Sequence, residues 1–189
     1  MRAFISLTIS ASVMGAAKLQ IIWPHFYHFF LKLAAVFSYQ QTPLAFPPYS
    51  FKLKGEGDSL FIFDEVRKKF LLLTPEEWVR QHVVQFLIQD KKVPKGLIQL
   101  EGGLNYNGLQ KRSDILVFNA AGEKILLVEC KAPSIKISQD TFDQITRYNF
   151  VHRVPWLLVS NGLAHYCCLL NWEEKSYQFV PELPVFADL

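Results

Sequence analysis

The sequence predicts an α/β fold, a mixed sheet with flanking helices, on the basis of three observations. Hydrophobic residues make up 50% and aromatic residues 14% of the 189 residues, which is enough apolar surface for a substantial core. Two segments carry apolar residues at helical spacing. Short apolar runs of strand length precede, separate and follow these segments. We therefore expect strands and helices to alternate along one domain.

The first helix is expected at residues 75–89. Thr74 precedes it as the N-cap, and Glu77, three positions later, completes a capping-box pattern. Val79 and Val83 recur at helical spacing and predict an apolar face toward the core. The other elements are expected in this order: a strand at 97–104, a hairpin of strands at 114–119 and 124–130, a helix at 138–151, a strand at 155–162, and a closing hairpin at 164–180.

The central hairpin has a short turn that contains Gly122, which predicts antiparallel pairing. Side chains alternate between the two faces of a strand, so Asp114, Glu129 and Lys131 are expected on one face. Counting outward from a turn at 120–123 gives the facing pairs Asn119 with Lys124, Phe118 with Ile125, Leu116 with Leu127, and Asp114 with Glu129.

Two acids, Asp114 and Glu129, are thus expected to face each other at the end of the hairpin. Opposed Cβ atoms lie about 4.5–5.5 Å apart, and like charges so placed destabilise the pair. Two such carboxylates need a proton, a cationic partner or a metal ion. Lys131 supplies one positive charge only, so the arrangement predicts a divalent-cation site with a lysine at its edge. In a second interpretation both acids are solvated at the end of the sheet.

The ligand types favour magnesium over zinc. Two carboxylates suit Mg²⁺, which also keeps several waters and binds substrate phosphate. The three cysteines, Cys130, Cys167 and Cys168, show no CxxC spacing, and the five histidines form no ligand pattern with them.

An aspartate followed by "ECK" at the end of the next strand resembles the PD-(D/E)xK nuclease superfamily. The combination of "VECKAP", "QDTFDQITRYN" and "PWLLVSNG" is more closely similar to the N-terminal nuclease domain of type I restriction endonuclease R subunits, in a short stand-alone form. The resemblance covers residue 44 to about residue 184. One departure is that "RSD" stands where the superfamily has its proline and aspartate.

The resemblance implies a restriction-endonuclease-like core of helix, strand, hairpin, helix and strand. It implies a Mg²⁺-dependent endonuclease that hydrolyses phosphodiester bonds in DNA, with Mn²⁺ as a substitute metal. Asp114, Glu129 and the carbonyl of Cys130 would hold the metal. Lys131 would position the attacking water or stabilise the charge that develops on the phosphate.

A glutamate of the first helix would join this site. Glu76 is preferred by register and by its ExxxR spacing to Arg80. Glu77 is better explained as a capping residue, although the two could exchange roles. Glu101 is either an additional ligand or part of a turn with the two glycines that follow it.

Substrate contacts are expected from three residues. Gln144 and Tyr148 are four apart on the second helix and resemble the QxxxY motif of the RecB-like branch, where it helps to orient substrate. Arg112 lies beside the predicted site and could contact DNA. For all three, an ordinary surface or half-buried position is the alternative.

The sequence also bears on partners. It has no Walker-type GxxxxGK[ST] pattern and hence no motor of that kind, so a motor or specificity subunit would act in trans. Two other classes stay open: a non-catalytic nucleic-acid-binding module with the same fold, and a structural protein in which the charged cluster is an internal ion-pair network.

Residues 1–41 differ in composition from the nuclease-like domain expected at 42–189. Residues 1–39 hold three basic residues and no acidic one, which leaves 17 residues of each sign for the rest, so bulk charge gives no argument for DNA binding. The segment is a mis-annotated start, a signal-like sequence or a packing extension. We expect no membrane contact for the core domain, and a cytoplasmic location.

Overall fold

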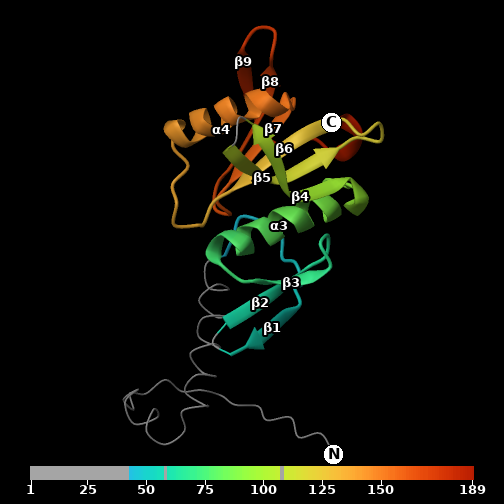
Figure 1. The fold of residues 1–189 in the computed structure, drawn as a ribbon, viewed down its shortest axis with the longest axis vertical. Helices are drawn as coiled ribbons and strands as arrows, with labels where there is room; N and C mark the ends of the chain where they lie inside the picture. Colours follow the sequence, from blue (N-terminus) through green and yellow to red (C-terminus); the bar gives the residue numbers. More distant parts are fainter. Residues whose placement is uncertain (1–42, 58, 107–108) are drawn as a thin grey trace, which may run out of the picture.

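The computed structural model describes residues 43–57, 59–106 and 109–189. Its elements form two sheets with a helix between them (Figure 1). Helix α3, Pro75–Gln89, lies between the small sheet and the large sheet, and helix α4, Gln139–His152, lies on the other side of the large sheet. The sequence prediction of an α/β protein with flanking helices is confirmed at this level.

The small sheet has three antiparallel strands, β1 (Leu53–Glu56), β2 (Ser59–Asp64) and β3 (Lys69–Leu72), in the order β1-β2-β3. Its apolar face is anchored by Ile62, which is fully buried against Leu73 and Trp78. Trp78 belongs to α3, so this helix joins the small sheet to the rest of the protein.

The large sheet has six strands in sequence order. They are β4 (Ile98–Tyr106), β5 (Leu109–Phe118), β6 (Lys124–Cys130), β7 (Trp156–Ser160), β8 (His165–Asn171) and β9 (Ser176–Val180). All neighbours are antiparallel except β6 and β7, which are parallel and are connected through α4. Short 3-10 helices lie at Lys95–Leu97 and Phe186–Asp188. The chain order is therefore α3, β4, β5, β6, α4, β7.

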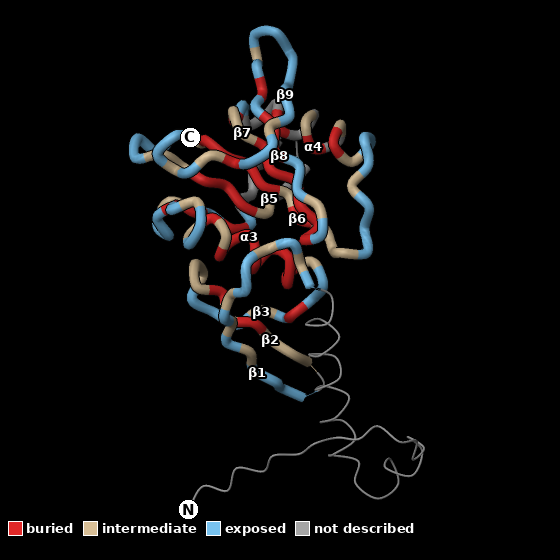
Figure 2. The backbone as a smooth tube through the Cα atoms, turned by 180° about the vertical axis from the view of Figure 1, so that it is seen from behind, coloured by how far each residue is buried: buried red, intermediate tan, exposed pale blue. Residues whose placement is uncertain are grey.

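Each face of the large sheet has its own core. Figure 2 shows that the central strands of this sheet and α3 carry many buried residues. On one face Val79 and Val83 of α3 pack among residues such as Ile115 and Val128. On the other face Phe142 and Ile145 of α4 pack with residues of the neighbouring strands. Alternate residues of β5 and β6 thus point to opposite helices, as strand geometry requires.

The start of α3 follows the expected capping chemistry in part. The Thr74 hydroxyl accepts a hydrogen bond from the Glu77 N–H at 3.0 Å, so the N-cap prediction is confirmed. The side chain of Glu77 is buried and binds other partners, described below, so we find no reciprocal half of the capping box.

The hairpin register is partly as predicted. Leu116 faces Leu127, but Phe118 faces Lys124, not Ile125, because the register shifts between Val117 and Phe118. The expected pairs Phe118–Ile125 and Asn119–Lys124 are therefore wrong.

The cause lies in the turn. The Asn119 side-chain oxygen accepts hydrogen bonds from the N–H groups of Ala121 and Glu123, at 3.0 and 2.9 Å. This Asx-type bonding draws Asn119 out of the ladder and makes the loop one residue longer than predicted.

Among the described residues, no helix is long and apolar enough to cross a membrane. The three interpretations of residues 1–41 concern a segment outside the described residues.

The turn after β7 gives a test of the packing. Gly162 has φ +82°, and an added Cβ would lie 2.8 Å from Leu44 Cδ2 and 3.0 Å from Val79 Cγ2. Gly122 has nearly the same φ, +81°, with nothing within 4 Å. We expect Gly122→Ala to cost about 1–2 kcal/mol for the left-handed backbone. Gly162→Ala should cost about 1–3 kcal/mol more, because the methyl group overpacks the contact with α3.

Urea denaturation of the two variants and wild type measures this difference. Equal losses in the free energy of unfolding would show that the Leu44 and Val79 side chains can move aside.

Candidate active site

The predicted acids and lysine meet where β5 and β6 separate. Ile115 pairs with Val128, and the next residue of β5 is Asp114. The N–H of Cys130 donates to Asp114 Oδ2 at 2.7 Å. In a regular ladder this N–H would donate to a backbone carbonyl of the neighbouring strand. The Asp114 carboxylate therefore lies between the strands and is held by the main chain.

Glu129 and Lys131 form the second part of the site. Lys131 Nζ donates to Glu129 Oε1 at 2.8 Å, and the two side chains are 29% and 18% exposed. On the other side Glu129 faces Val159 of β7, a fully buried residue. The pair is thus shielded from water on the β7 side.

A cation that the sequence argument left out of the site also contacts Asp114. Arg80 of α3, with a side chain 9% exposed, donates from Nη2 to Asp114 Oδ1 at 2.7 Å. The inference that Lys131 is the sole cation available to the two acids is therefore wrong. A usable signal was present: Arg80 shares helical spacing (i+3, i+4, i+7) with Val83, Val84 and Leu87, so it lies on an apolar stripe, and a buried partner for it was to be expected.

The two glutamates of the first helical turn have different surroundings. The Glu76 side chain is 44% exposed and lies 3.3 Å from Arg80 Nη2, which is the contact its ExxxR spacing predicted. Glu77 is buried and accepts hydrogen bonds from Arg80 Nη1, from Gln81 Nε2 at 2.8 Å and from Arg67 Nη2 at 3.3 Å. Glu77 is therefore a buried ion-pair partner and not a surface cap.

Glu101 and Arg67 extend the same group of charges. Glu101, at the middle of β4, has φ +52° and lies 3.0 Å from Arg67 Nη1 and 3.5 Å from Arg80 Nη1. It is therefore an ion-pair partner of both arginines. We call the following residues the ionic cluster: Asp64, Arg67, Glu76, Glu77, Arg80, Glu101, Asp114, Glu129 and Lys131.

The electrostatics of the site centre on Glu129. Burial raises its pKa, and the charge of Asp114 raises it further, to about 7, against the opposing effect of Lys131. Burial lowers the pKa of Lys131, but its hydrogen bond to Glu129 and the charges of Glu129, Asp114 and Glu76 outweigh this effect, so its pKa is raised. These mutual effects bring Glu76, Asp114, Glu129 and Lys131 into one electrostatic unit.

The ionic cluster contains the ligand type that a hard divalent cation prefers, carboxylate oxygen. Six carboxylates and three basic side chains make up the ionic cluster, so it carries an excess of negative charge when all groups are ionised. Each Asp114 oxygen accepts one hydrogen bond and keeps a second lone pair. In the part of the chain that the structure describes, no group of three His, Cys, Asp or Glu residues is arranged to hold a metal. The metal assignment to Asp114, Glu129 and the Cys130 carbonyl stays a prediction.

The predicted substrate contacts are placed only by their backbone. Gln144 and Tyr148 belong to α4, and Arg112 to β5, two residues before Asp114. Their side chains are outside the described part of the structure, so their roles stay predictions.

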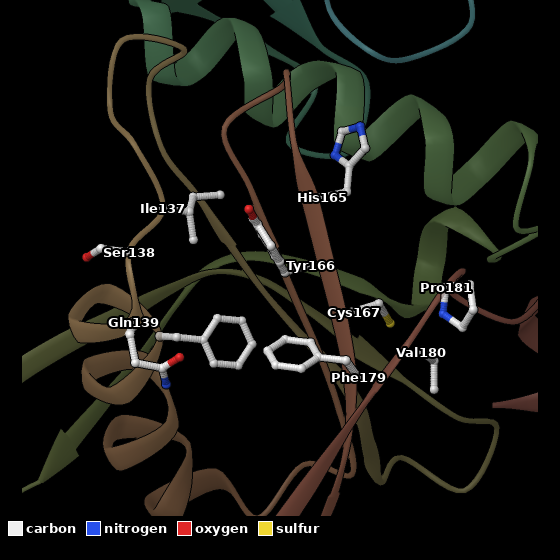
Figure 3. Close-up of a pocket in the computed structure, with 10 residues that line it drawn as sticks. Ile137, Ser138, Gln139, His165, Tyr166, Cys167, Phe179, Val180 and Pro181 are labelled. Atoms are coloured by element: carbon white, nitrogen blue, oxygen red, sulfur yellow. The ribbon is translucent and has the colours of Figure 1, made fainter.

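A separate cleft of about 500 Å³ lies between the start of α4 and the β8–β9 hairpin (Figure 3). Ile137, Tyr166 and Phe179 are among its lining residues. Asp114, Glu129 and Lys131 do not line it, so the predicted catalytic residues lie outside this cleft.

The raised pKa of Glu129 gives a pH-dependent stability. The folded protein holds this proton up to about pH 7, whereas an unperturbed glutamate releases it near 4.5. The stabilisation from the neutral form is therefore complete below about pH 4.5 and is lost as the pH rises to about 7. Glu129→Gln stays neutral throughout. We expect this variant to gain free energy of unfolding relative to wild type between pH 5 and pH 8.

Urea denaturation without added metal measures the gain, and Glu173→Gln, an exposed position, is the matched control. A difference between Glu129→Gln and wild type that stays constant with pH would mean that Glu129 is ionised across the whole range.

Comparisons with known proteins agree with the family resemblance seen in the sequence. The family described as type I restriction enzyme R protein N terminus (HSDR_N) matches residues 75–184, which is more than half of the chain. The chain is also similar to the fragment structure of a putative HsdR subunit of a type I restriction enzyme from Vibrio vulnificus YJ016, at 22% identity and a TM-score of 0.32. That alignment covers 47% of this chain and 16% of the other. No curated protein matches. From the family match, this chain belongs to the type I restriction enzyme R protein N-terminal family.

Proposed function

We propose that the protein is a metal-dependent nuclease that hydrolyses phosphodiester bonds in DNA, with a PD-(D/E)xK type of core. The observation that carries the proposal is the pairing of partly buried Glu129 with Lys131 at 2.8 Å, next to Asp114 on the adjacent strand. Ionisable groups whose pKa is shifted by burial and by a specific neighbour cluster at functional sites. The order α3, β4, β5, β6, α4, β7 and the family match support the same function.

In this proposal Asp114, Glu129 and the Cys130 carbonyl hold Mg²⁺, and Mn²⁺ can replace it. The metal supplies polarisation of a phosphate oxygen and an activated water. Glu129 must lose its proton to serve as a ligand, which its pKa of about 7 allows near neutral pH. Glu76, which is half exposed and lies 3.3 Å from Arg80 Nη2, would complete the ligand shell through its carboxylate or a water.

Lys131 changes partner in this mechanism. Without metal its ammonium group neutralises Glu129. With a metal bound to Glu129, Lys131 Nζ would be available to position the attacking water or to contact the phosphate.

Arg80 and the Cys130 N–H fix the orientation of Asp114. One holds Oδ1 and the other Oδ2, each at 2.7 Å. A ligand held on both oxygens loses little freedom on binding, as a preorganised site requires.

The substrate and partners follow from the same proposal. DNA is the proposed substrate, with Gln144, Tyr148 and Arg112 facing it. The proposal also places this domain, together with a motor or specificity subunit, within a larger restriction complex in the cytoplasm. Activity confined to such a complex and DNA binding without catalysis are the two variants of this proposal.

A structural ion-pair network is the second candidate, and one observation favours it. Arg80 lies 2.7 Å from Asp114 and Lys131 lies 2.8 Å from Glu129, so each acid has a cation of its own. In such a network the loss of Lys131 would leave Glu129 buried with less compensation and would destabilise the fold by about 3–5 kcal/mol.

A cleavage assay with Lys131→Ala separates the two candidates. We expect the variant to lose at least about 100-fold in cleavage rate, the size of effect seen when one charge-stabilising donor is removed. Its thermal unfolding should stay close to that of wild type. Duplex, single-stranded and branched DNA are tested with Mg²⁺, Mn²⁺ and EDTA. Lys136→Ala, an exposed lysine on the next loop, is the control. Full activity of Lys131→Ala, or its unfolding, would contradict the nuclease proposal.

Metal binding gives a test that needs no substrate. If Glu129 is a ligand, Mg²⁺ must displace its proton, so we expect proton release on binding near pH 7. Calorimetric titrations in buffers of different ionisation enthalpy measure the number of protons released. Glu129→Gln should abolish the release, and unchanged release in that variant would exclude Glu129 as the proton source.

A further inference from the structure

One member of the ionic cluster lies outside the family match, next to the small sheet. Arg67 belongs to the turn between β2 and β3, whereas the match begins at residue 75. Its side chain is only 13% exposed and lies against three carboxylates. Nε is 2.7 Å from Asp64, Nη2 is 3.3 Å from Glu77 and Nη1 is 3.0 Å from Glu101. An arginine on this turn therefore faces the helix and the strand that carry the candidate site.

The guanidinium of Arg67 is held in place by its own turn. Asp64 is fully buried, and its Oδ1 accepts the N–H groups of Val66 and Arg67, each at 2.8 Å. Its Oδ2 accepts Arg67 Nε at 2.7 Å and Gln81 Nε2 at 3.0 Å. Four donors saturate the carboxylate. The orientation of Arg67 is thus fixed by the fold of the small sheet and by α3.

Charges of alternating sign run from this turn to the candidate site. Glu77 accepts Arg67 through Oε1 and Arg80 through Oε2. Arg80 in turn donates to Asp114 Oδ1 at 2.7 Å. Glu101 forms a second bridge between the two arginines. Each inner residue of this series of charges has a partner of opposite charge on both sides. Such pairing allows the charged groups to be buried.

The loss of Arg67 would change the competition for Arg80. Glu77 and Glu101 would each lose one cation, and both already contact Arg80 Nη1. The two acids, with less positive charge near them, would attract the Arg80 guanidinium more strongly and move it away from Asp114. Asp114 would then keep only the Cys130 N–H as a fixed donor, and its Oδ1 would be free to turn.

We propose that Arg67 is a positioning residue for Arg80 and Asp114, and that the small sheet is thereby a working part of the candidate nuclease site. For its catalytic consequence the inference rests on the proposed function. It adds that the region matching the family is incomplete as a site without residues 53–72.

The first test is independent of catalysis. A double-mutant cycle combines Arg67→Met with Asp114→Asn and measures unfolding by urea without metal or DNA. The two residues are connected through Glu77 and Arg80, so we expect their effects on unfolding to be clearly non-additive. The same cycle with Lys69→Met, an exposed residue of β3, should be additive. Additive effects in the Arg67 cycle would overturn the inference.

The second test measures cleavage. We expect Arg67→Met to lower kcat by about 10–100-fold, the usual effect of losing a supporting partner of a ligand, with KM for DNA nearly unchanged. Arg67→Lys should recover little of the rate, because one ammonium group cannot reach three carboxylates in the directions that the planar guanidinium does. Full rescue by lysine would show that only the charge matters and would overturn positioning.

A control separates positioning from simple loosening of the small sheet. Ile62→Val removes one methylene from its buried core without touching the ionic cluster. At a temperature where both variants are folded, we expect Ile62→Val to keep the wild-type kcat. An equal loss in both variants would overturn the inference. If wild type cleaves no DNA, the proposed function fails, and the double-mutant cycle still decides whether Arg67 acts on Asp114.

Discussion

The buried guanidinium of Arg80 is the interaction on which the rest of the site depends. It lies on the stripe of α3 that also carries Val83 and Val84, and it contacts Asp114 of β5 at 2.7 Å, with Glu77 on its other nitrogen. A charge so placed is tolerable only with partners of opposite sign around it. Three parts of the protein supply them: the first turn of α3, the middle of β4 and the end of the β5–β6 pairing. The need of Arg80 for acidic partners therefore fixes the position of α3 against the large sheet, next to the predicted catalytic residues.

The same requirement explains how the site combines a stable fold with reactive groups. Asp114 is fixed on both oxygens, by Arg80 and by the main chain of Cys130. Glu129 has one cation, Lys131, and a pKa raised to about 7 by burial and by Asp114. One acid is thus compensated and rigid, whereas the other changes its protonation near neutral pH. This asymmetry is suited to a site that binds a divalent cation when Glu129 loses its proton, as proposed for a member of this restriction enzyme family.

Sequence reasoning reached the local features of the site and missed its long-range contacts. The Thr74 cap, the Glu76–Arg80 spacing and the Leu116–Leu127 pairing follow from periodicity over a few residues, and the structure has them. The register beyond Val117 was wrong because a side chain, Asn119, took over backbone hydrogen bonds, which a count of residues does not include. The contacts of Arg80 with Asp114 and of Arg67 with Glu77 and Glu101 span 34, 10 and 34 residues, and no local pattern specifies such partners.

The sequence by itself determined the class of fold, and it placed an aspartate and an ExK triplet on adjacent strands, although β5 begins at Leu109 and not at Asp114 as expected. It could do so because alternation of side chains and capping chemistry act within one element or one hairpin. Only the tertiary structure decided which cation each acid binds, that Glu77 is buried while Glu76 is half exposed, and that the turn after β2 reaches the site. Those outcomes depend on how α3 packs between the two sheets. Because this packing buries the charged side chains, each of them needs a partner of opposite charge, and that partner can be distant in sequence.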